Sequence, residues 1–116
     1  MYKMLVLIRR KPGLSREEFR AYYEEHHAPW GIELLGTSLR RYVRNYVTGG
    51  TDDGPDVVTE FWWNTREDFE AFLKLRENSD IGRLLREDEE QFMDFGTVQL
   101  LIVDEVEQLQ PVKARA

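Results

Sequence analysis

Residues 2–10, YKMLVLIRR, form a segment in which odd and even positions are both hydrophobic up to the closing arginines. The short apolar run and its aliphatic, β-branched composition predict a strand rather than a helix. Because successive side chains of a strand point to opposite faces of the sheet, this strand is hydrophobic on both faces. We therefore expect a strand that is covered on two sides, which limits the folds that the rest of the chain can form.

The first helix is predicted directly after the turn KPG. Ser15 and Glu18 fit the S-x-x-E capping box, in which each side chain bonds the backbone N–H of the other residue. The helix is expected to continue through REEFRAYYEEHH. Pro29 disfavours helical backbone at the residue before it, so we expect the helix to end near His27 and a less regular segment to follow at 30–38.

Two segments rich in β-branched and aromatic residues follow, LRRYVRNYV at 39–47 and DVVTEFWWN at 56–64. The polar residues between them predict a turn, and hence an antiparallel hairpin. A second helix is expected after Asn64 or Thr65, with an interruption at ENSD. Its inward face is predicted to contain Phe69, Phe72, Leu73 and Arg76. A last strand, again apolar on both faces, is predicted from residue 96.

The element order β-α-β-β-α-β predicts an α+β, ferredoxin-like fold with a four-stranded antiparallel sheet. Two helices can cover only one face of that sheet, although the first and last strands are apolar on both faces. We therefore expect a homodimer in which two sheets pack face to face as a dimeric α/β barrel. One domain is expected over residues 1–105, followed by a C-terminal tail at 106–116 that is disordered or exchanged with the partner.

The sequence has 116 residues, a formal net charge of −6 and no cysteine. The negative charge disfavours a nucleic-acid partner, because the phosphate backbone would be repelled. The absence of cysteine excludes disulfides, thiolate catalysis and thiolate metal sites. The first apolar run is too short to span a membrane, and basic residues follow it rather than precede it. We therefore expect a cytoplasmic protein with no membrane partner.

Several chemistries require motifs that the sequence lacks. Adjacent histidines cannot easily bind one metal ion, and no other histidine spacing typical of a metal site occurs. TGGTDDG lacks the G-K-[ST] of a P-loop, no serine lies in G-x-S-x-G, and the dinucleotide-binding fingerprint is absent. We therefore expect neither a metal nor another cofactor.

His26 and His27 are the only histidines, and they end the predicted first helix. On a helical wheel of about 100° per residue both lie near the apolar face that contains Phe19, with His26 closer to its centre. One interpretation is a pair of helix-end residues whose rings bond the last free carbonyls. The other is a catalytic histidine that transfers a proton at neutral pH inside an apolar pocket.

Asp88 is the second candidate for a catalytic role. Helical spacing places it on an apolar face, close to Leu85 and Phe92. A carboxylate in that position needs a partner, and an arginine or a backbone amide would give it a purely structural role. In the functional interpretation it orients the imidazole or acts as a second acid or base. Asp94 is a weaker alternative, because its place before Gly96 also suits a helix end.

Aromatic side chains near these candidates are predicted to line a substrate cavity. Because Trp62 and Trp63 point to opposite faces of their strand, at most one of them can line it. Arg40 or Arg44 is a candidate for binding a phenolate or carboxylate group of the substrate. The full set of predicted substrate-binding residues is Tyr22, Tyr23, Trp30, Tyr42, Arg44, Trp62, Trp63, Phe92 and Asp94.

Over about residues 1–105 the chain resembles the EthD family of dimeric α/β-barrel proteins. The resemblance rests on RRKPGLSREEF, YYEEHHAPW, RRYVRNYV, DVVTEFWWNTREDFEAF and DEEQFMD. Its most specific parts are the histidine before Ala-Pro and the D-E-x-x-F-x-D element. The family pattern Thr-His-Ala-Pro-Leu corresponds to residues 26–30 of this chain. The resemblance therefore selects His27 as the functional histidine, whereas His26 replaces a residue that is usually not histidine.

The resemblance also implies a class of activity. Members occur in ether-degradation gene sets and in aromatic polyketide pathways, where relatives act as cofactor-free cyclases, decarboxylases or dehydratases. We accordingly expect a cofactor-free acid/base enzyme that acts on a hydrophobic, aromatic or polyketide-like carbonyl compound, with His27 transferring the proton. The alternatives are a non-catalytic small-molecule-binding or accessory protein, and a cofactor-independent monooxygenase like those of the wider superfamily.

Overall fold

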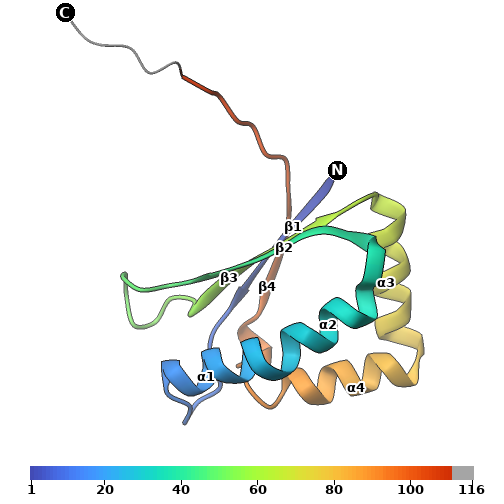
Figure 1. Ribbon diagram of the computed structural model, residues 1–116. Coiled ribbons are helices and arrows are strands. Elements are labelled where there is room, and N and C mark those ends of the chain that lie inside the picture. Colours follow the sequence, from blue (N-terminus) through green and yellow to red (C-terminus); the bar gives the residue numbers. More distant parts are fainter. Residues whose placement is uncertain (111–116) are drawn as a thin grey trace, which may run out of the picture.

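The computed structural model describes residues 1–110, which form one antiparallel sheet with its helices on one face (Figure 1). The strands are β1 (Tyr2–Ile8), β2 (Leu39–Tyr46), β3 (Val57–Trp63) and β4 (Gln99–Val103). The helices are α1 (Arg16–Tyr22), α2 (Ala28–Leu35), α3 (Arg66–Asn78) and α4 (Asp80–Glu89). The strand order β2-β3-β1-β4 confirms the predicted ferredoxin-like fold.

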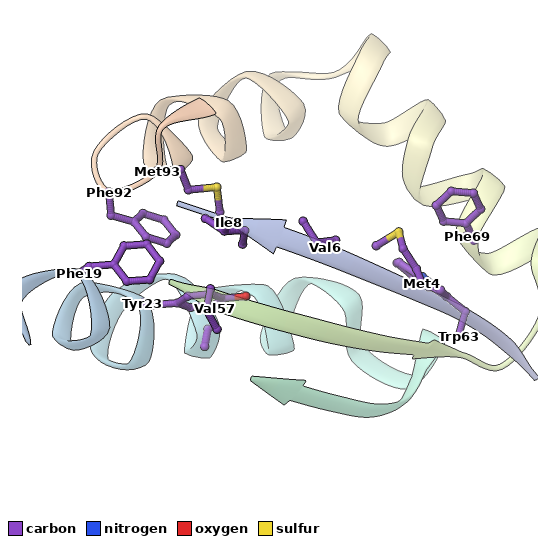
Figure 2. Close-up of a cluster of buried hydrophobic side chains, with 11 residues drawn as sticks. Met4, Val6, Ile8, Phe19, Tyr23, Val57, Trp63, Phe69, Phe92 and Met93 are labelled. Atoms are coloured by element: carbon purple, nitrogen blue, oxygen red, sulfur yellow. The ribbon is translucent and has the colours of Figure 1, made fainter. Parts of the chain in front are cut away.

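Strand β1 lies in the middle of the sheet, because it pairs with β3 on one side and with β4 on the other. Its even-numbered side chains from Met4 to Ile8 are buried against the helices, as Figure 2 shows. Leu5 and Leu7 point to the opposite face. Leu101 of β4 lies directly across from Leu5 on that face and is 42% exposed. The described residues thus cover only one of the two apolar faces of β1.

The first helix does not end near His27 as predicted, but continues to Leu35 through a π-helical turn at Tyr23–His27. In this turn the Ala28 N–H donates to the Tyr23 carbonyl, five residues earlier. Pro29 follows in the first turn of α2, where a missing N–H and a fixed φ are tolerated. The prediction was wrong because proline needs a local change of hydrogen bonding, which a π turn provides without ending the helix.

The remaining boundaries follow the predicted capping signals. Ser15 and Glu18 form the capping box of α1, and the Thr65 side chain accepts a hydrogen bond from the backbone of Asp68 at the start of α3. The interruption at ENSD separates α3 from α4, and Ser79 caps α4. The last strand begins later than predicted, because residues 95–97 form a short 3₁₀ turn.

Beyond β4 the described part of the predicted tail, 106–110, contains neither helix nor strand and extends away from the sheet (Figure 1). The other predicted tail residues, 111–116, lie outside the described part of the chain, and the domain boundary at residue 105 stays a prediction. No helix among residues 1–110 is long and apolar enough to cross a membrane.

The hydrophobic core fills the space between the sheet and the helices and is rich in aromatic rings (Figure 2). Phe92 contacts the rings of Phe19, Tyr23 and His27, with centroid separations of 5.7, 5.3 and 5.0 Å. Trp63 contacts Phe69 in the same way at 5.8 Å. These contacts hold α1, the π turn, α3 and the segment after α4 in fixed positions above the sheet.

We predict that Gly82→Ala strongly destabilises the fold, because an added Cβ would overlap the backbone carbonyl of Arg76, where α4 packs closely on α3. The expected loss is about 3 kcal/mol or more, which exceeds the gain of about 1 kcal/mol in helix propensity. Gly31→Ala in α2 is the matched control, since nothing lies near its Cβ position. Thermal unfolding followed by circular dichroism measures both. Equal melting temperatures for the two variants would contradict the close packing.

Candidate active site

A largely apolar cavity of about 270 Å³ lies between the helix-bearing face of the sheet and the helices. Its lining comes from the π turn, α2, α3, α4, the 3₁₀ turn at 95–97 and the sheet, with β1 forming much of its floor. Among the described residues, only four lining side chains carry a polar or charged group, namely His27, Tyr42, Arg76 and Glu89. The arrangement is typical of a small-molecule site, in which a few polar groups orient a mostly hydrophobic ligand.

His27 lies at the end of the π turn and is 8% exposed. Its Nδ1 is 2.7 Å from Oδ2 of Asp88 on α4. Nε2 makes no hydrogen bond to another residue in the described range. Because an ionised carboxylate can only accept hydrogen bonds, Nδ1 carries the proton in this pair, and the lone pair of the neutral imidazole is on Nε2.

His26 is exposed, and its ring contacts that of Tyr22 in a tilted arrangement with a centroid separation of 5.0 Å. The helical wheel was wrong about which histidine is closer to the apolar face. A π turn contains about one residue more than an α turn, so the inward position falls one residue later in the sequence. The wheel assumed a constant period, whereas the helix changes its period at Tyr23.

Asp88 also bonds a second residue of the first helix. Its Oδ1 accepts a hydrogen bond of 2.5 Å from the Tyr22 hydroxyl. Burial, together with the interaction with Asp88, raises the pKa of Tyr22 to about 12. Tyr22 therefore keeps its proton at neutral pH and acts as a donor. The two oxygens of the Asp88 carboxylate are held by Tyr22 and His27, which fixes the orientation of the imidazole.

Arg76 and Glu89 form a second charged pair next to the first. Nη1 and Nη2 of Arg76 donate to the two carboxylate oxygens of Glu89 at 2.8 and 2.6 Å. Glu89 is 8% exposed. Helical spacing predicted Arg76 on the inward face of α3, whereas the inward position of Glu89 was not predicted. The spacing of four between Leu85, Glu89 and Met93 was the signal that could have found it.

Tyr42 lines the cavity as predicted, and its hydroxyl donates to that of Tyr23 at 2.8 Å. Tyr23 bonds Thr59 at 2.9 Å and belongs to the core rather than to the cavity lining. Burial raises the pKa of both phenols, to about 12 for Tyr23 and further for Tyr42. Neither phenol ionises near neutral pH, so both serve as hydrogen-bonding groups.

The two tryptophans of β3 do not line the cavity. Trp62 points to the other face of the sheet, where the Lys3 ammonium lies 4.3 Å from the centroid of its ring. Trp63 is 0% exposed and, like Phe92, is a core residue. Strand alternation correctly predicts that the two rings lie on opposite faces, but it does not determine whether the cavity extends to Trp63.

Four further predicted binding residues also lie outside the cavity lining. Arg44 is bonded by Nε and Nη2 to the carboxylate of Glu24, at 2.9 and 2.7 Å, and this pair holds the pKa of Glu24 below its usual range. Trp30 is half-buried but does not line the cavity, whereas the next residue of α2, Gly31, does. Asp94 borders a separate shallow depression near the end of β1. Tyr22 acts through Asp88 and is not a lining residue.

The described residues contain no group of three or more histidine, aspartate or glutamate side chains that could hold a metal ion. The polar and ionisable groups that line the cavity are one imidazole, one guanidinium, one phenol and one carboxylate. Of these groups, the imidazole is the one that transfers protons most readily near neutral pH.

Comparisons with known proteins agree with this fold. The EthD domain family matches residues 11–96, which is most of the chain. An EthD family protein of Bacillus halodurans is 18% identical, with a TM-score of 0.66 over 91% of this chain and 100% of that chain. A dimeric ferredoxin-like protein of unknown function from Bacteroides fragilis is 9% identical, with a TM-score of 0.57 over 90% and 95% of the two chains.

A Nitrosomonas europaea protein, provisionally described as an antibiotic biosynthesis monooxygenase, is 15% identical, with a TM-score of 0.56 over 92% of this chain and 100% of that chain. No curated protein matches the sequence. The structural neighbours share the fold, and the family match extends from the turn before α1 to the 3₁₀ turn before β4. On that basis, the chain belongs to the EthD family.

Proposed function

We propose that this protein is an acid/base enzyme that removes a proton from a carbon next to a carbonyl group in a hydrophobic compound. The observation that carries the proposal is the hydrogen bond of 2.7 Å between His27 and Asp88 at the lining of an apolar cavity. An imidazole whose Nδ1 is held by a carboxylate offers Nε2 as a base. The reaction requires proton transfer only, so the proposal includes no cofactor.

In the proposed step Nε2 of His27 takes the proton from the α-carbon. The electron pair of the C–H bond forms a C=C bond, and the π pair of the carbonyl group moves onto oxygen to give an enolate. The imidazolium that forms is stabilised by Asp88, with which it makes a charge-assisted hydrogen bond. It then returns the proton to oxygen or carbon. Cyclisation and dehydration can proceed through such an enolate, whereas in a decarboxylation the enolate forms when the bond to the carboxylate carbon breaks and CO₂ leaves.

The size and lining of the cavity support an aromatic or polyketide-like substrate. Aromatic and aliphatic side chains form most of the lining, and the volume of about 270 Å³ is near the lower end for small-molecule sites. A compound of one or two rings suits that space better than a long multicyclic one. A protein that binds such a compound without turnover would use the same cavity, and the experiments on His27 separate the two functions.

The proposal includes a homodimer. Leu5, Leu7 and Leu101 lie on the sheet face that the helices leave open. A second copy of the sheet is the complementary apolar surface, and dimeric proteins occur among the structural neighbours. The proposal also includes a cytoplasmic location.

We predict that Leu101→Glu converts the dimer into a monomer, because a charge would be buried between the two sheets. Leu84→Glu on α4 is the matched control, since Leu84 is 43% exposed on the helical side and Leu101 is 42% exposed on the open face. Size-exclusion chromatography with light scattering gives the molar mass of each variant. A wild-type protein that is monomeric at micromolar concentration would refute the dimer.

We predict that His27→Ala lowers the rate of hydrogen–deuterium exchange at the α-carbons of 2-tetralone by about 100-fold or more, because general base catalysis contributes that much. 2-Tetralone is a small aromatic ketone, and NMR in D₂O follows its exchange. His26→Ala, the neighbouring exposed histidine, is expected to stay within about twofold of wild type, since its ring only contacts that of Tyr22. Full exchange activity in His27→Ala, or dependence on O₂, would exclude the proposed step.

We predict that Asp88→Asn lowers the same exchange rate by about tenfold or more, because a charged hydrogen bond to the imidazole is lost. ¹⁵N NMR of the imidazole should show the Nδ1–H tautomer of His27 in wild type and a mixture of tautomers in the variant. Asp94→Asn is the control, since that carboxylate borders a different depression. An unchanged tautomer in Asp88→Asn would show that Asp88 does not orient His27.

A further inference from the structure

Arg76 has hydrogen-bonding capacity that its pairing with Glu89 does not use. The guanidinium has five N–H donors, and the two bonds to Glu89 occupy two of them. Its side chain makes no other hydrogen bond within residues 1–110. Since Arg76 lines the cavity, the remaining donors are available to a ligand there.

A purely structural role explains this pair poorly. Burying an ion pair gains little stability over hydrophobic side chains of similar volume, and the surrounding lining is apolar. A second Arg–Glu pair, Arg83–Glu87, lies within α4. It is exposed and its residues are four apart, as expected of a pair on a helix surface. Among the Arg–Glu pairs of residues 1–110, only Arg76–Glu89 joins two helices and borders the cavity.

The guanidinium and the proposed base line the same cavity, and two successive residues of α4 hold them. Asp88 bonds His27 and the next residue, Glu89, bonds Arg76. The Cα atoms of two successive residues are about 3.8 Å apart, so adjacent positions on α4 anchor both groups. Because His27 and Arg76 both line the cavity, a ligand there can meet a proton acceptor and a fixed cation in the same space.

We propose that Arg76 binds the carbonyl oxygen of the substrate and stabilises the negative charge that forms there when His27 removes the α-proton. Glu89 is the positioning residue that holds the guanidinium fork. The inference rests on the proposed proton transfer for its catalytic part. In the step, the carbonyl π pair becomes an oxygen lone pair, which Arg76 contacts through an N–H group.

The test compares two ligands of nearly equal shape, 2-naphthol and naphthalene. The oxygen and planar rings of 2-naphthol imitate the enolate of 2-tetralone, whereas naphthalene lacks the oxygen. Wild-type protein is expected to bind 2-naphthol about tenfold more tightly, as a hydrogen bond to a charged group would give. Ligand fluorescence or calorimetry measures both dissociation constants. A wild-type protein without this preference would overturn the proposal.

The decisive variant is Arg76→Gln/Glu89→Gln, which removes both charges and leaves no unpaired carboxylate in the interior. Its preference for 2-naphthol is expected to fall to about twofold or less, with the affinity for naphthalene unchanged. Arg83→Gln/Glu87→Gln, which makes the same change at the exposed pair of α4, should keep the preference. The melting temperature of each variant shows whether it is folded. A preference that survives in Arg76→Gln/Glu89→Gln refutes the role of Arg76.

The binding measurement separates this inference from the proposed function. If 2-tetralone exchange depends on His27 and the 2-naphthol preference does not depend on Arg76, the role of Arg76 is wrong and the proton transfer stands. If the preference depends on Arg76 and His27→Ala exchanges like wild type, the proton transfer is wrong. Arg76 is then the oxygen-binding residue of a ligand-binding protein.

Discussion

The π-helical turn at Tyr23–His27 is the constraint on which the site depends. Residues five apart on an α-helix differ by about 140° around the axis, and they cannot both reach one side chain. Hydrogen bonds from residue i+5 to residue i bring such positions nearly into line. Tyr22 and His27 are five residues apart, and both bond the carboxylate of Asp88. The same turn carries the chain past Pro29 without ending the helix, so α2 can contribute Gly31 to the cavity lining.

The two carboxylates of α4 explain why the helices meet in one particular arrangement. Asp88 and Glu89 are turned toward the interior, where a carboxylate without a partner would be costly. Asp88 is matched by groups from the first helix, and Glu89 is matched by Arg76 from α3. A shift of any of these helices would separate at least one pair. The polar groups of the site thus determine how the helices pack as well as what the cavity can do.

The strands, the caps and the element order could be predicted from sequence because each depends on local chemistry. The two-faced hydrophobicity of β1, the Ser15–Glu18 capping box and the break at Ser79 need no knowledge of distant residues. The site was only partly predictable. A helical wheel with one period places His26 inward, and only the family pattern selected His27, because a π turn has no simple sequence signal. Tyr22, Tyr42 and Glu89 take their roles from partners more than ten residues away.

The described residues leave the cavity partly open to solvent. Leu100 of β4 lines it and is 48% exposed, so water has access when no ligand is bound. Water weakens charge interactions, and a hydrophobic ligand that fills the space displaces it. The His27–Asp88 and Arg76–Glu89 pairs then act in a medium of lower polarity, where their hydrogen bonds are stronger. In the proposed mechanism, binding of apolar rings strengthens the groups that act on the carbonyl, so a small polar ketone that leaves the cavity wet would react slowly even at saturation.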